Sequence, residues 1–269
     1  MKHILVPTDF SENAKKALDF ALEIAQKSNA KLSVLNSYFQ PSANVEVMKS
    51  SLMEIMANDS KEGLQETEKY IKSIAPNLEV VYISLRDTLH LAINEVAKND
   101  EVDFLVMGTK GATGLKETLI GSNAANILDK INIPCLLIPD AYVPSKFEKV
   151  GIAYDLQPIS NFHNIRTLNN IVDLVQAKTI IGSVNSHKQL NSAQEEYINL
   201  LKTEVKAADS VFLNIDSTVE GIHAFEIQQK IDMLVMFKRK VGFFENLFHK
   251  SITKKIAIHT HIPLLVLHD

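Results

Sequence analysis

The stretch that decides the fold is Phe104-Leu-Val-Met-Gly108-Thr-Lys-Gly111-Ala-Thr-Gly114-Leu-Lys-Glu-Thr-Leu-Ile-Gly121-Ser122. Four of the nine glycines of the chain lie in residues 108–121, between a strand-like run and a helix-like run. Glycine lets backbone N–H groups approach an anion closely, and the first turn of a following helix offers further unpaired N–H groups. This placement predicts a loop that binds the phosphates of a nucleotide.

Strand-like and helix-like runs alternate on both sides of this loop. The first is a buried strand at residues 4–6, and Ser11 is a candidate N-cap for a helix with a stripe of small and apolar residues: Ala14, Ala17, Leu18, Ala21, Leu22 and Ala25. Further strands are expected at 32–35, 78–83, 104–107 and 135–138, and further helices at 48–74, 89–98 and 123–130. Such alternation predicts an open α/β domain, in which helices cover a mostly parallel sheet.

The chain also repeats itself. Residues 103–107 and 131–140 match residues 232–236 and 260–269 at an offset of 129, and residues 3–9 match residues 149–155 at an offset of 146. We therefore predict two tandem domains, 1–143 and 147–269, with a short linker between them. The difference of 17 between the offsets makes the second repeat shorter, and we expect the missing residues to belong to a loop.

Composition limits the possible functions. The 269 residues are 46% hydrophobic and carry a formal net charge of −4, which argues against a nucleic-acid binder that relies on bulk positive charge. A single cysteine, Cys135, cannot form an intrachain disulfide, and its apolar surroundings in the sequence predict a buried thiol. No apolar run reaches the roughly 18 residues of a membrane span. We therefore expect a cytoplasmic protein without nucleic-acid or membrane partners.

The pattern Gly108-x2-Gly111-x9-Gly121-Ser122, after Leu-Val-Met and before a helix and an Ile-Pro strand, resembles the ATP-binding motif of the universal stress protein family. The opening Ile-Leu-Val-Pro7-Thr8-Asp9 resembles the first strand and loop of that family. The resemblance covers both ends of the first repeat and, more weakly, the second. It implies a tandem member whose two Rossmann-like domains, of the adenine nucleotide alpha hydrolase type, pack as an intramolecular pseudo-dimer through the strands at 135–138 and 264–267. A homodimer of chains is a further expectation.

The resemblance also implies an adenine nucleotide site, with ATP as the ligand and Mg²⁺ on its phosphates. Its residues would be Pro7, Thr8, Asp9, Ser37, Met107, Gly108, Lys110, Gly111, Gly121, Ser122 and Asn123. Asp9 would accept hydrogen bonds from the ribose or the base, and Met107 would pack against the base. Ser37 stands where the family often has valine against the adenine. Taken singly, Asp9 could simply cap a helix, Met107 could be ordinary core and Gly114 could serve a turn.

Aligned at the same offset of 129, the second repeat lacks the glycines of the phosphate loop. Phe237, Lys240 and Lys250 stand at the places of the three motif glycines, and Phe243 and Phe244 could fill the space. Asp155 remains at the place of Asp9. We predict no ATP site there. Two interpretations are open for the basic residues Lys238, Arg239, Lys240 and Lys250: a solvated loop surface, or recruitment of a different anion.

No nucleophile elbow or metal-ligand spacing accompanies these motifs, and His249, His259 and His261 lack cysteine or carboxylate partners at zinc-site spacing. The resemblance therefore implies a regulatory protein of the stress response that binds ATP in its first domain only. Three alternatives remain open. The first is a slow ATPase or autophosphorylating enzyme that uses the same residues, and the second is an interaction scaffold that binds no nucleotide. The third is a protein that binds another adenine nucleotide, such as AMP or a cyclic dinucleotide, because Ser37 changes the residue beside the base.

Overall fold

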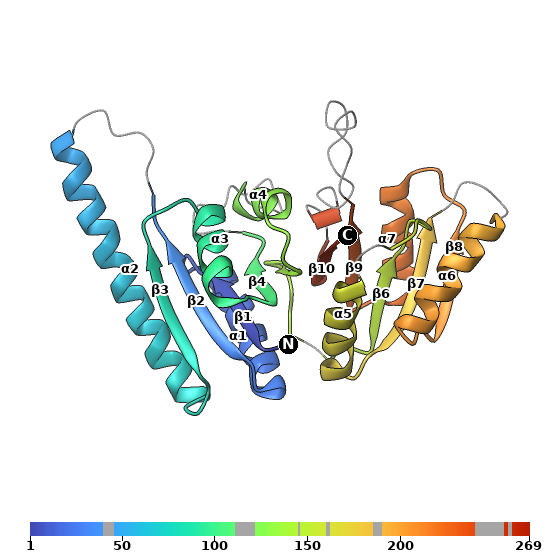
Figure 1. Cartoon of the computed structure of the whole chain (residues 1–269), viewed down its shortest axis with the longest axis horizontal. Helices are drawn as coiled ribbons and strands as arrows, with labels where there is room; N and C mark the ends of the chain where they lie inside the picture. The colour runs from blue at the N-terminus through green and yellow to red at the C-terminus, as the bar shows by residue number, and fades with distance from the viewer. Residues whose placement is uncertain are drawn as a thin grey trace. The chain divides into compact units, whose positions relative to one another are not determined.

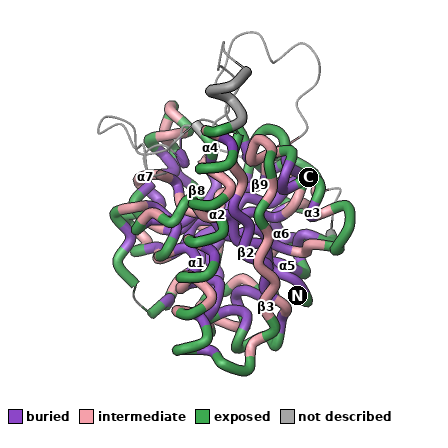
Figure 2. Tube along the Cα trace, turned by 90° about the vertical axis from the view of Figure 1, so that its left-hand side faces the viewer, coloured by how far each residue is buried: buried purple, intermediate pink, exposed green. Residues whose placement is uncertain are grey.

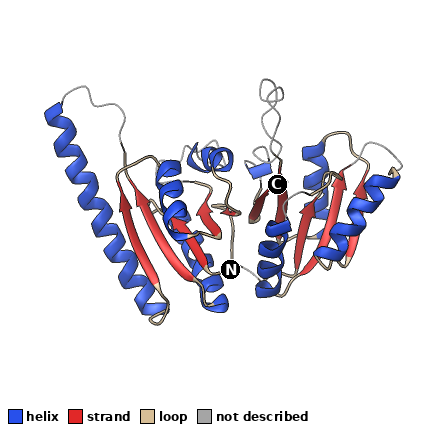
Figure 3. Cartoon of the chain, in the orientation of Figure 1, coloured by secondary structure: helices blue, strands red, loops and turns tan. Residues whose placement is uncertain are grey.

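The computed structural model describes residues 1–39, 46–110, 122–144, 146–159, 162–184, 190–239, 256–257 and 260–269. The chain forms two compact units, which divide between residues 133 and 134. Each unit consists of strands flanked by helices (Figure 3). The α/β class is confirmed for both, while the limits 1–143 and 147–269 stay a prediction about the folding domains.

Unit 1 is an open sheet with helices on both faces. Its elements are β1 (His3–Pro7), α1 (Glu12–Ser28), β2 (Lys31–Ser37), α2 (Glu46–Ile74), β3 (Val80–Leu85), α3 (Leu89–Asp100), β4 (Phe104–Gly108) and α4 (Ser122–Lys130). The strands run parallel in the order β3-β2-β1-β4. Figure 1 shows α3 in front of these strands and α1 behind them. Because the strand order reverses at β1, the ends of β1 and β4 form a topological switch point, where open α/β sheets bind their ligands.

The first helix forms as its sequence predicts. The Ser11 hydroxyl accepts a hydrogen bond from the Ala14 backbone nitrogen at 3.2 Å, and Asn29 ends the helix in the left-handed conformation with φ 52°. Every member of the predicted stripe is buried, and α1 packs against β1 and β4. Figure 2 shows the same division in the molecule, where the strands are mostly purple and the outer helix surfaces are green.

Unit 2 repeats this architecture. Its elements are β5 (Cys135–Ile138), β6 (Lys149–Ala153), α5 (Phe162–Val175), β7 (Lys178–Val184), α6 (Ser192–Glu204), β8 (Asp209–Leu213), α7 (Thr218–Gln229), β9 (Met233–Lys238) and β10 (Leu264–His268). The strand order is β5-β10-β9-β6-β7-β8, and the pair of β5 with β10 is antiparallel. Leu264 lies opposite Leu137, so the predicted meeting of these two strands is confirmed. Cys135 on β5 is buried, and burial raises the pKa of its thiol.

The repeat is exact at the level of strand register. Ile4 of β1 lies opposite Phe104 of β4, and their counterparts Val150 and Met233 lie opposite each other in β6 and β9. The tandem fold is thus confirmed by backbone pairing as well as by sequence.

Two aspartates at equivalent positions fasten the first strand of each unit. A carboxylate oxygen of Asp103 accepts hydrogen bonds from the backbone nitrogens of Lys2 and His3, at 2.6 and 3.1 Å. An oxygen of Asp232 accepts the same pair from Glu148 and Lys149, both at 2.8 Å. The matched aspartates of the sequence repeat therefore perform the same structural task.

The expectation that the second repeat is shortened in a loop is wrong. The helix α2 has 29 residues, whereas its counterpart α6 has 13. Figure 1 shows that the first turns of α2 run past the end of β3, where they cover no strand. Such turns can be lost without uncovering the sheet, so the second repeat is shorter mainly in this helix.

Candidate functional site

Four of the predicted site residues, Thr8, Asp9, Gly108 and Lys110, lie at the switch point of unit 1. We use "first carboxyl edge" for Thr8 and Asp9, which follow β1, together with Gly108, Thr109 and Lys110 at the end of β4. Because β1 and β4 are parallel neighbours with Leu5 opposite Leu105, the register carried onward brings these two segments to the same edge of the sheet. The sequence prediction named every one of these residues except Thr109.

A residue that the sequence prediction missed, Asn13 of α1, holds the second of these segments in place. Its side chain is 3% exposed, and its Oδ1 atom accepts a hydrogen bond from the Lys110 backbone nitrogen at 2.8 Å. A Cβ atom on Gly108 would lie 2.6 Å from the same oxygen, closer than real Cβ atoms approach. Glycine is therefore required at position 108 because the Asn13 side chain lies against the backbone. The signal available in the sequence was a polar residue beside the apolar stripe of α1.

A second asparagine fastens the Thr8 segment. Asn36 of β2 is 8% exposed, and its Nδ2 atom donates to the Thr8 carbonyl oxygen at 2.7 Å. The Thr8 backbone nitrogen donates to the Leu35 carbonyl at 2.9 Å. An oxygen of Asp9 accepts from the Ser11 backbone nitrogen at 3.1 Å, although the Asp9 side chain itself is exposed. This turn places an accessible carboxylate at the edge.

Phe10 connects this turn to α2. It has a left-handed backbone with φ 63°, which is uncommon for a bulky side chain. Its ring packs onto Gly63, where an added Cβ atom would lie 2.4 Å from the ring. The glycine in the middle of α2 thus makes room for an aromatic ring that follows Asp9 directly.

The remaining predicted residues have different surroundings. Pro7 and Met107 are buried, Ser37 is half-buried opposite Leu85 at the end of β2, and Asn123 is exposed on α4. Gly111, Gly114 and Gly121 lie outside the described residues, as does the side chain of Ser122, whose backbone begins α4. The burial of Met107 agrees with a core role, and a role against a base stays a prediction.

Thr109 at this edge carries a buried hydroxyl group that could form a further hydrogen bond. The residue is 2% exposed, and its Oγ1 atom has no hydrogen-bond partner within the described part of the chain. Buried hydroxyls in proteins are nearly always paired, so an unpaired one beside Gly108 and Lys110 fits a segment that receives a polar partner.

The structure also bears on metal ions and membranes. The described residues contain no group of three or more histidine, cysteine or carboxylate side chains placed to hold a metal ion. His249 and His259 lie outside them. No helix in the described ranges has both the length and the apolar character needed to cross a bilayer.

The equivalent edge of unit 2 is filled by side chains. We use "second carboxyl edge" for Tyr154 and Asp155 after β6 and Phe237 to Arg239 at the end of β9. The buried rings of Tyr154 and Phe237 meet edge to face, with centroids 6.3 Å apart and an interplanar angle of 72°. Burial and the charge of Asp155 raise the pKa of Tyr154 to about 12, against a smaller opposing effect of Arg239. Of the other predicted blocking residues, Lys240, Phe243, Phe244 and Lys250 lie outside the described part.

The interpretation of residues 238–240 and 250 as a solvated loop surface is wrong for Arg239. Its side chain is 24% exposed and forms ion pairs with Asp155 and Asp269. Burial disfavours the charge of the guanidinium, but the hydrogen bond and charge of Asp155 and the charge of Asp269 outweigh this effect and raise the pKa of Arg239. This arginine is therefore occupied within the chain.

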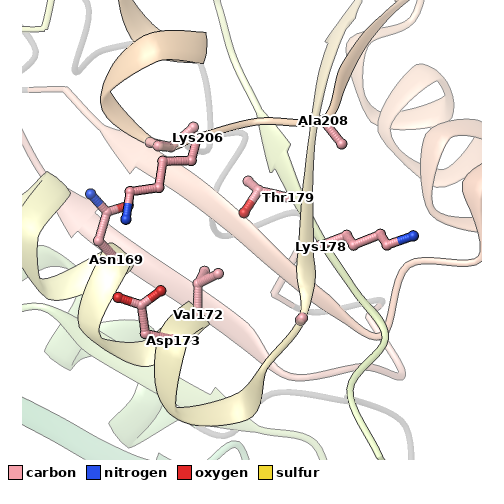
Figure 4. Close-up of a pocket in the computed structure, with 9 residues that line it drawn as sticks. Asn169, Val172, Asp173, Lys178, Thr179, Lys206 and Ala208 are labelled. Carbon is pink, nitrogen blue, oxygen red and sulfur yellow. The ribbon is translucent and has the colours of Figure 1, made fainter.

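A separate hollow of about 240 Å³ lies in unit 2, away from the second carboxyl edge (Figure 4). It is bounded by the end of α5, the start of β7 and the turn between α6 and β8. In Figure 4 the side chains of Asn169 and Lys206 lie next to each other at its rim, while Lys178 points away. The Asn169 amide is already engaged, since its Nδ2 atom donates to the Glu204 carbonyl at 2.8 Å. The hollow therefore presents no convergent set of reactive groups.

Known proteins resemble this chain in sequence and in fold. The model of the universal stress protein family matches residues 1–139. A universal stress protein of Methanocaldococcus jannaschii is 30% identical over 153 residues, covering 51% of this chain and 94% of the relative. One from Bacillus subtilis is 29% identical over 145 residues, covering 50% of this chain and 97% of the relative.

Solved structures extend the likeness to the whole chain. A universal stress protein from Archaeoglobus fulgidus has a TM-score of 0.75 at 20% identity, over 99% of this chain and 98% of that one. A protein of unknown function from Pseudomonas aeruginosa has a TM-score of 0.68 at 14% identity, over 100% and 92%. At these identities the likeness shows the fold, which is a tandem pair of α/β units. The family match and the tandem fold together show that this chain belongs to the universal stress protein family.

Proposed function

We propose that unit 1 binds ATP at the first carboxyl edge and that the chain acts as a nucleotide-dependent regulator in the stress response. The observation that carries this proposal is the close approach of Asn13 to Gly108 and Lys110. It fixes a glycine-containing segment at a topological switch point, where adenine and dinucleotide ligands bind in related folds. Membership in the universal stress protein family supports the same assignment.

Different residues would contact different parts of the ATP molecule. Thr8, Asp9 and Ser37 would face the adenosine, and the exposed carboxylate of Asp9 would accept hydrogen bonds from ribose hydroxyls. Met107 and Pro7 would pack beneath the base. The side chain of Lys110, with Gly108 and Gly111, would lie along the ribose and phosphates.

The first turn of α4 would complete the phosphate site, with Gly121, Ser122 and Asn123 as donors. Unpaired N–H groups and the helix dipole favour an anion at this position. Because the described residues hold no metal cluster of their own, Mg²⁺ would arrive on the phosphate oxygens of ATP. We further propose a cytoplasmic protein whose β5–β10 pairing supports an intramolecular pseudo-dimer.

The decisive experiment is to strip the purified full-length protein of nucleotide and titrate it calorimetrically with ATP and Mg²⁺. We expect one ATP per chain. Gly108→Val should abolish binding because its side chain would displace Asn13, whereas Phe237→Leu, at the equivalent position of unit 2, should leave it intact. Two ATP per chain would contradict a blocked second edge, and none would support the nucleotide-free scaffold. Divalent-dependent release of ADP would support the enzyme.

A further inference from the structure

Arg239 forms an unusually complete set of hydrogen bonds at the second carboxyl edge. Its Nε and Nη2 atoms donate to the two oxygens of Asp155 at 3.1 and 2.8 Å, which is the bidentate arrangement. Nη2 also donates to the Gln157 carbonyl at 3.1 Å. Nη1 donates to the Pro158 carbonyl at 2.7 Å and to a carboxylate oxygen of Asp269. An arginine has five N–H donors, and these five acceptors use all of them.

The acceptors come from segments that are distant in sequence. Asp155, Gln157 and Pro158 belong to the turn after β6, Arg239 follows β9, and Asp269 follows β10. The Asp269 side chain is only 5% exposed, and a carboxylate so far from water needs a cation or several donors. The Asp269 backbone nitrogen also donates to the Lys238 carbonyl at 3.0 Å. One guanidinium therefore neutralises a buried carboxylate and joins three chain segments.

The sequence repeat shows which residues of unit 1 correspond to this cluster. Arg239 stands at the position of Lys110 and Asp155 at that of Asp9, by the offsets of 129 and 146. In unit 1 the Lys110 backbone is held by Asn13 and Asp9 accepts from Ser11, with its side chain exposed. In unit 2 the two equivalent positions bind each other. The chain thus supplies a cation of its own to the aspartate that it retains in unit 2.

We propose that the Arg239 guanidinium is the built-in ligand of the second carboxyl edge, and that without this side chain the edge becomes a binding site for a free guanidinium compound. Asp155 is the principal acceptor, in bidentate geometry, and Asp269 and the carbonyls of Gln157 and Pro158 complete the site. This proposal is independent of nucleotide binding by unit 1, and it accounts for the retention of Asp155 where the phosphate loop has been lost.

An ordinary surface ion pair would look different. Exposed pairs contribute little to stability and are rarely bidentate with additional backbone acceptors. Although the Asp155 side chain is 48% exposed, those of Arg239 and Asp269 are only 24% and 5% exposed. The guanidinium is also a rigid fork that a lysine cannot reproduce. The cluster should therefore respond to the shape of the cation as well as to its charge.

The test uses thermal unfolding of the nucleotide-free, full-length protein. We expect Arg239→Ala to lower the unfolding midpoint by about 10 °C, because the buried Asp269 carboxylate then loses its cation. Millimolar N-methylguanidinium should restore much of this loss, whereas methylammonium at the same concentration should not. Arg166→Ala, which removes an exposed arginine of the same unit, should show neither the loss nor the rescue.

A second variant tests the acceptor. Adding Asp155→Asn to Arg239→Ala should abolish the rescue, because the bidentate acceptor is then gone. The proposal is overturned if Arg239→Ala unfolds at the wild-type temperature, if methylammonium rescues equally, or if rescue persists without Asp155. If Arg239→Ala does not fold, Arg239→Lys provides the measurement: it should unfold at a lower temperature than wild type, and an unchanged midpoint would refute the requirement for a guanidinium. Failure of ATP to bind unit 1 would leave each of these outcomes unaffected.

Discussion

Asn13 and Lys110 are 97 positions apart in the chain, yet the side-chain oxygen of Asn13 accepts a hydrogen bond from the Lys110 backbone nitrogen at 2.8 Å. This contact joins the first turn of α1, the helix that follows Thr8 and Asp9, to the segment of the first carboxyl edge at the end of β4. It gives α1 a direct role in the shape of the site, which its apolar stripe alone does not suggest.

Asn13→Ala should weaken ATP binding about tenfold, because the segment at Lys110 loses the bond that orders it, at a cost near 1.4 kcal/mol. Calorimetric titration measures the change. Asn164→Ala is the matched control, since Asn164 is equally buried in α5 and donates to the His268 carbonyl. It should destabilise the protein without altering ATP affinity. Equal affinity losses in both variants would contradict the assignment.

Gly108→Ala should destabilise the protein by about 1–3 kcal/mol, because its Cβ atom would overlap Asn13. The measurement is denaturant unfolding of the single variant and of the double variant with Asn13→Ala. Removal of the Asn13 side chain clears the atom that lies 2.6 Å away, so Gly108→Ala should cost clearly less in that background. Strict additivity of the two substitutions would show that the contact does not determine the need for glycine.

Gly63→Ala tests the packing of Phe10 on α2. Alanine in a helix interior is favoured over glycine by about 1 kcal/mol, but here the new Cβ atom meets the Phe10 ring. In the wild-type background we therefore expect Gly63→Ala to leave the free energy of unfolding nearly unchanged or to lower it. In the Phe10→Ala background the same substitution should raise it by about 1 kcal/mol. Thermal unfolding of the four proteins completes the cycle. The same gain in both backgrounds would mean that the ring moves aside without cost.

Asp103→Ala and Asp232→Ala should each lower the free energy of unfolding by about 1–3 kcal/mol, because each removes two hydrogen bonds to a charged oxygen. Denaturant unfolding of both variants measures the effect. Similar losses are expected because the two aspartates hold equivalent strands. A large loss in one and none in the other would contradict the structural equivalence of the repeats.

Glu226→Gln should stabilise the protein at neutral pH. Burial raises the pKa of Glu226 against the smaller effects of a hydrogen bond and charge from His223 and the charge of His261. A carboxyl group with a raised pKa in the folded state stabilises the fold at pH values below its unfolded pKa, and this stability is lost as pH rises through the folded value. The free energy of unfolding of Glu226→Gln should therefore exceed that of the wild type by about 1 kcal/mol at pH 7 and equal it at pH 4. Unfolding at both pH values gives the comparison, and a loss at pH 7 would contradict it.

The elements of unit 1 could be predicted because their signals are local. The stripe from Ala14 to Ala25 needs only the helical period, and Ser11 needs only the first turn of its own helix. The pairing of β5 with β10 was also predictable, from the family resemblance and from two short apolar strands at matching places in the repeats.

The partners of Asn13 and Arg239 could not be predicted in the same way. Each side chain binds groups that are about a hundred positions away in the chain or at the end of another strand, and neither residue carries a local motif. The sequence placed Arg239 in a basic run, and only the positions of Asp155 and Asp269 show that it is neutralised. The shortening of α6 was missed for a related reason. The difference between the two offsets gives the number of absent residues, but it does not show whether those residues covered a strand.

The antiparallel pair of β5 and β10 has a consequence for how the protein is made. Leu137 and Leu264 are more than 120 positions apart, so β5 leaves the ribosome well before its partner is synthesised. During that interval the apolar strand Cys135–Ile138 has a row of backbone groups without their final partner, which is the kind of edge on which nascent chains associate. Premature termination of translation anywhere between these strands would leave that edge permanently uncovered.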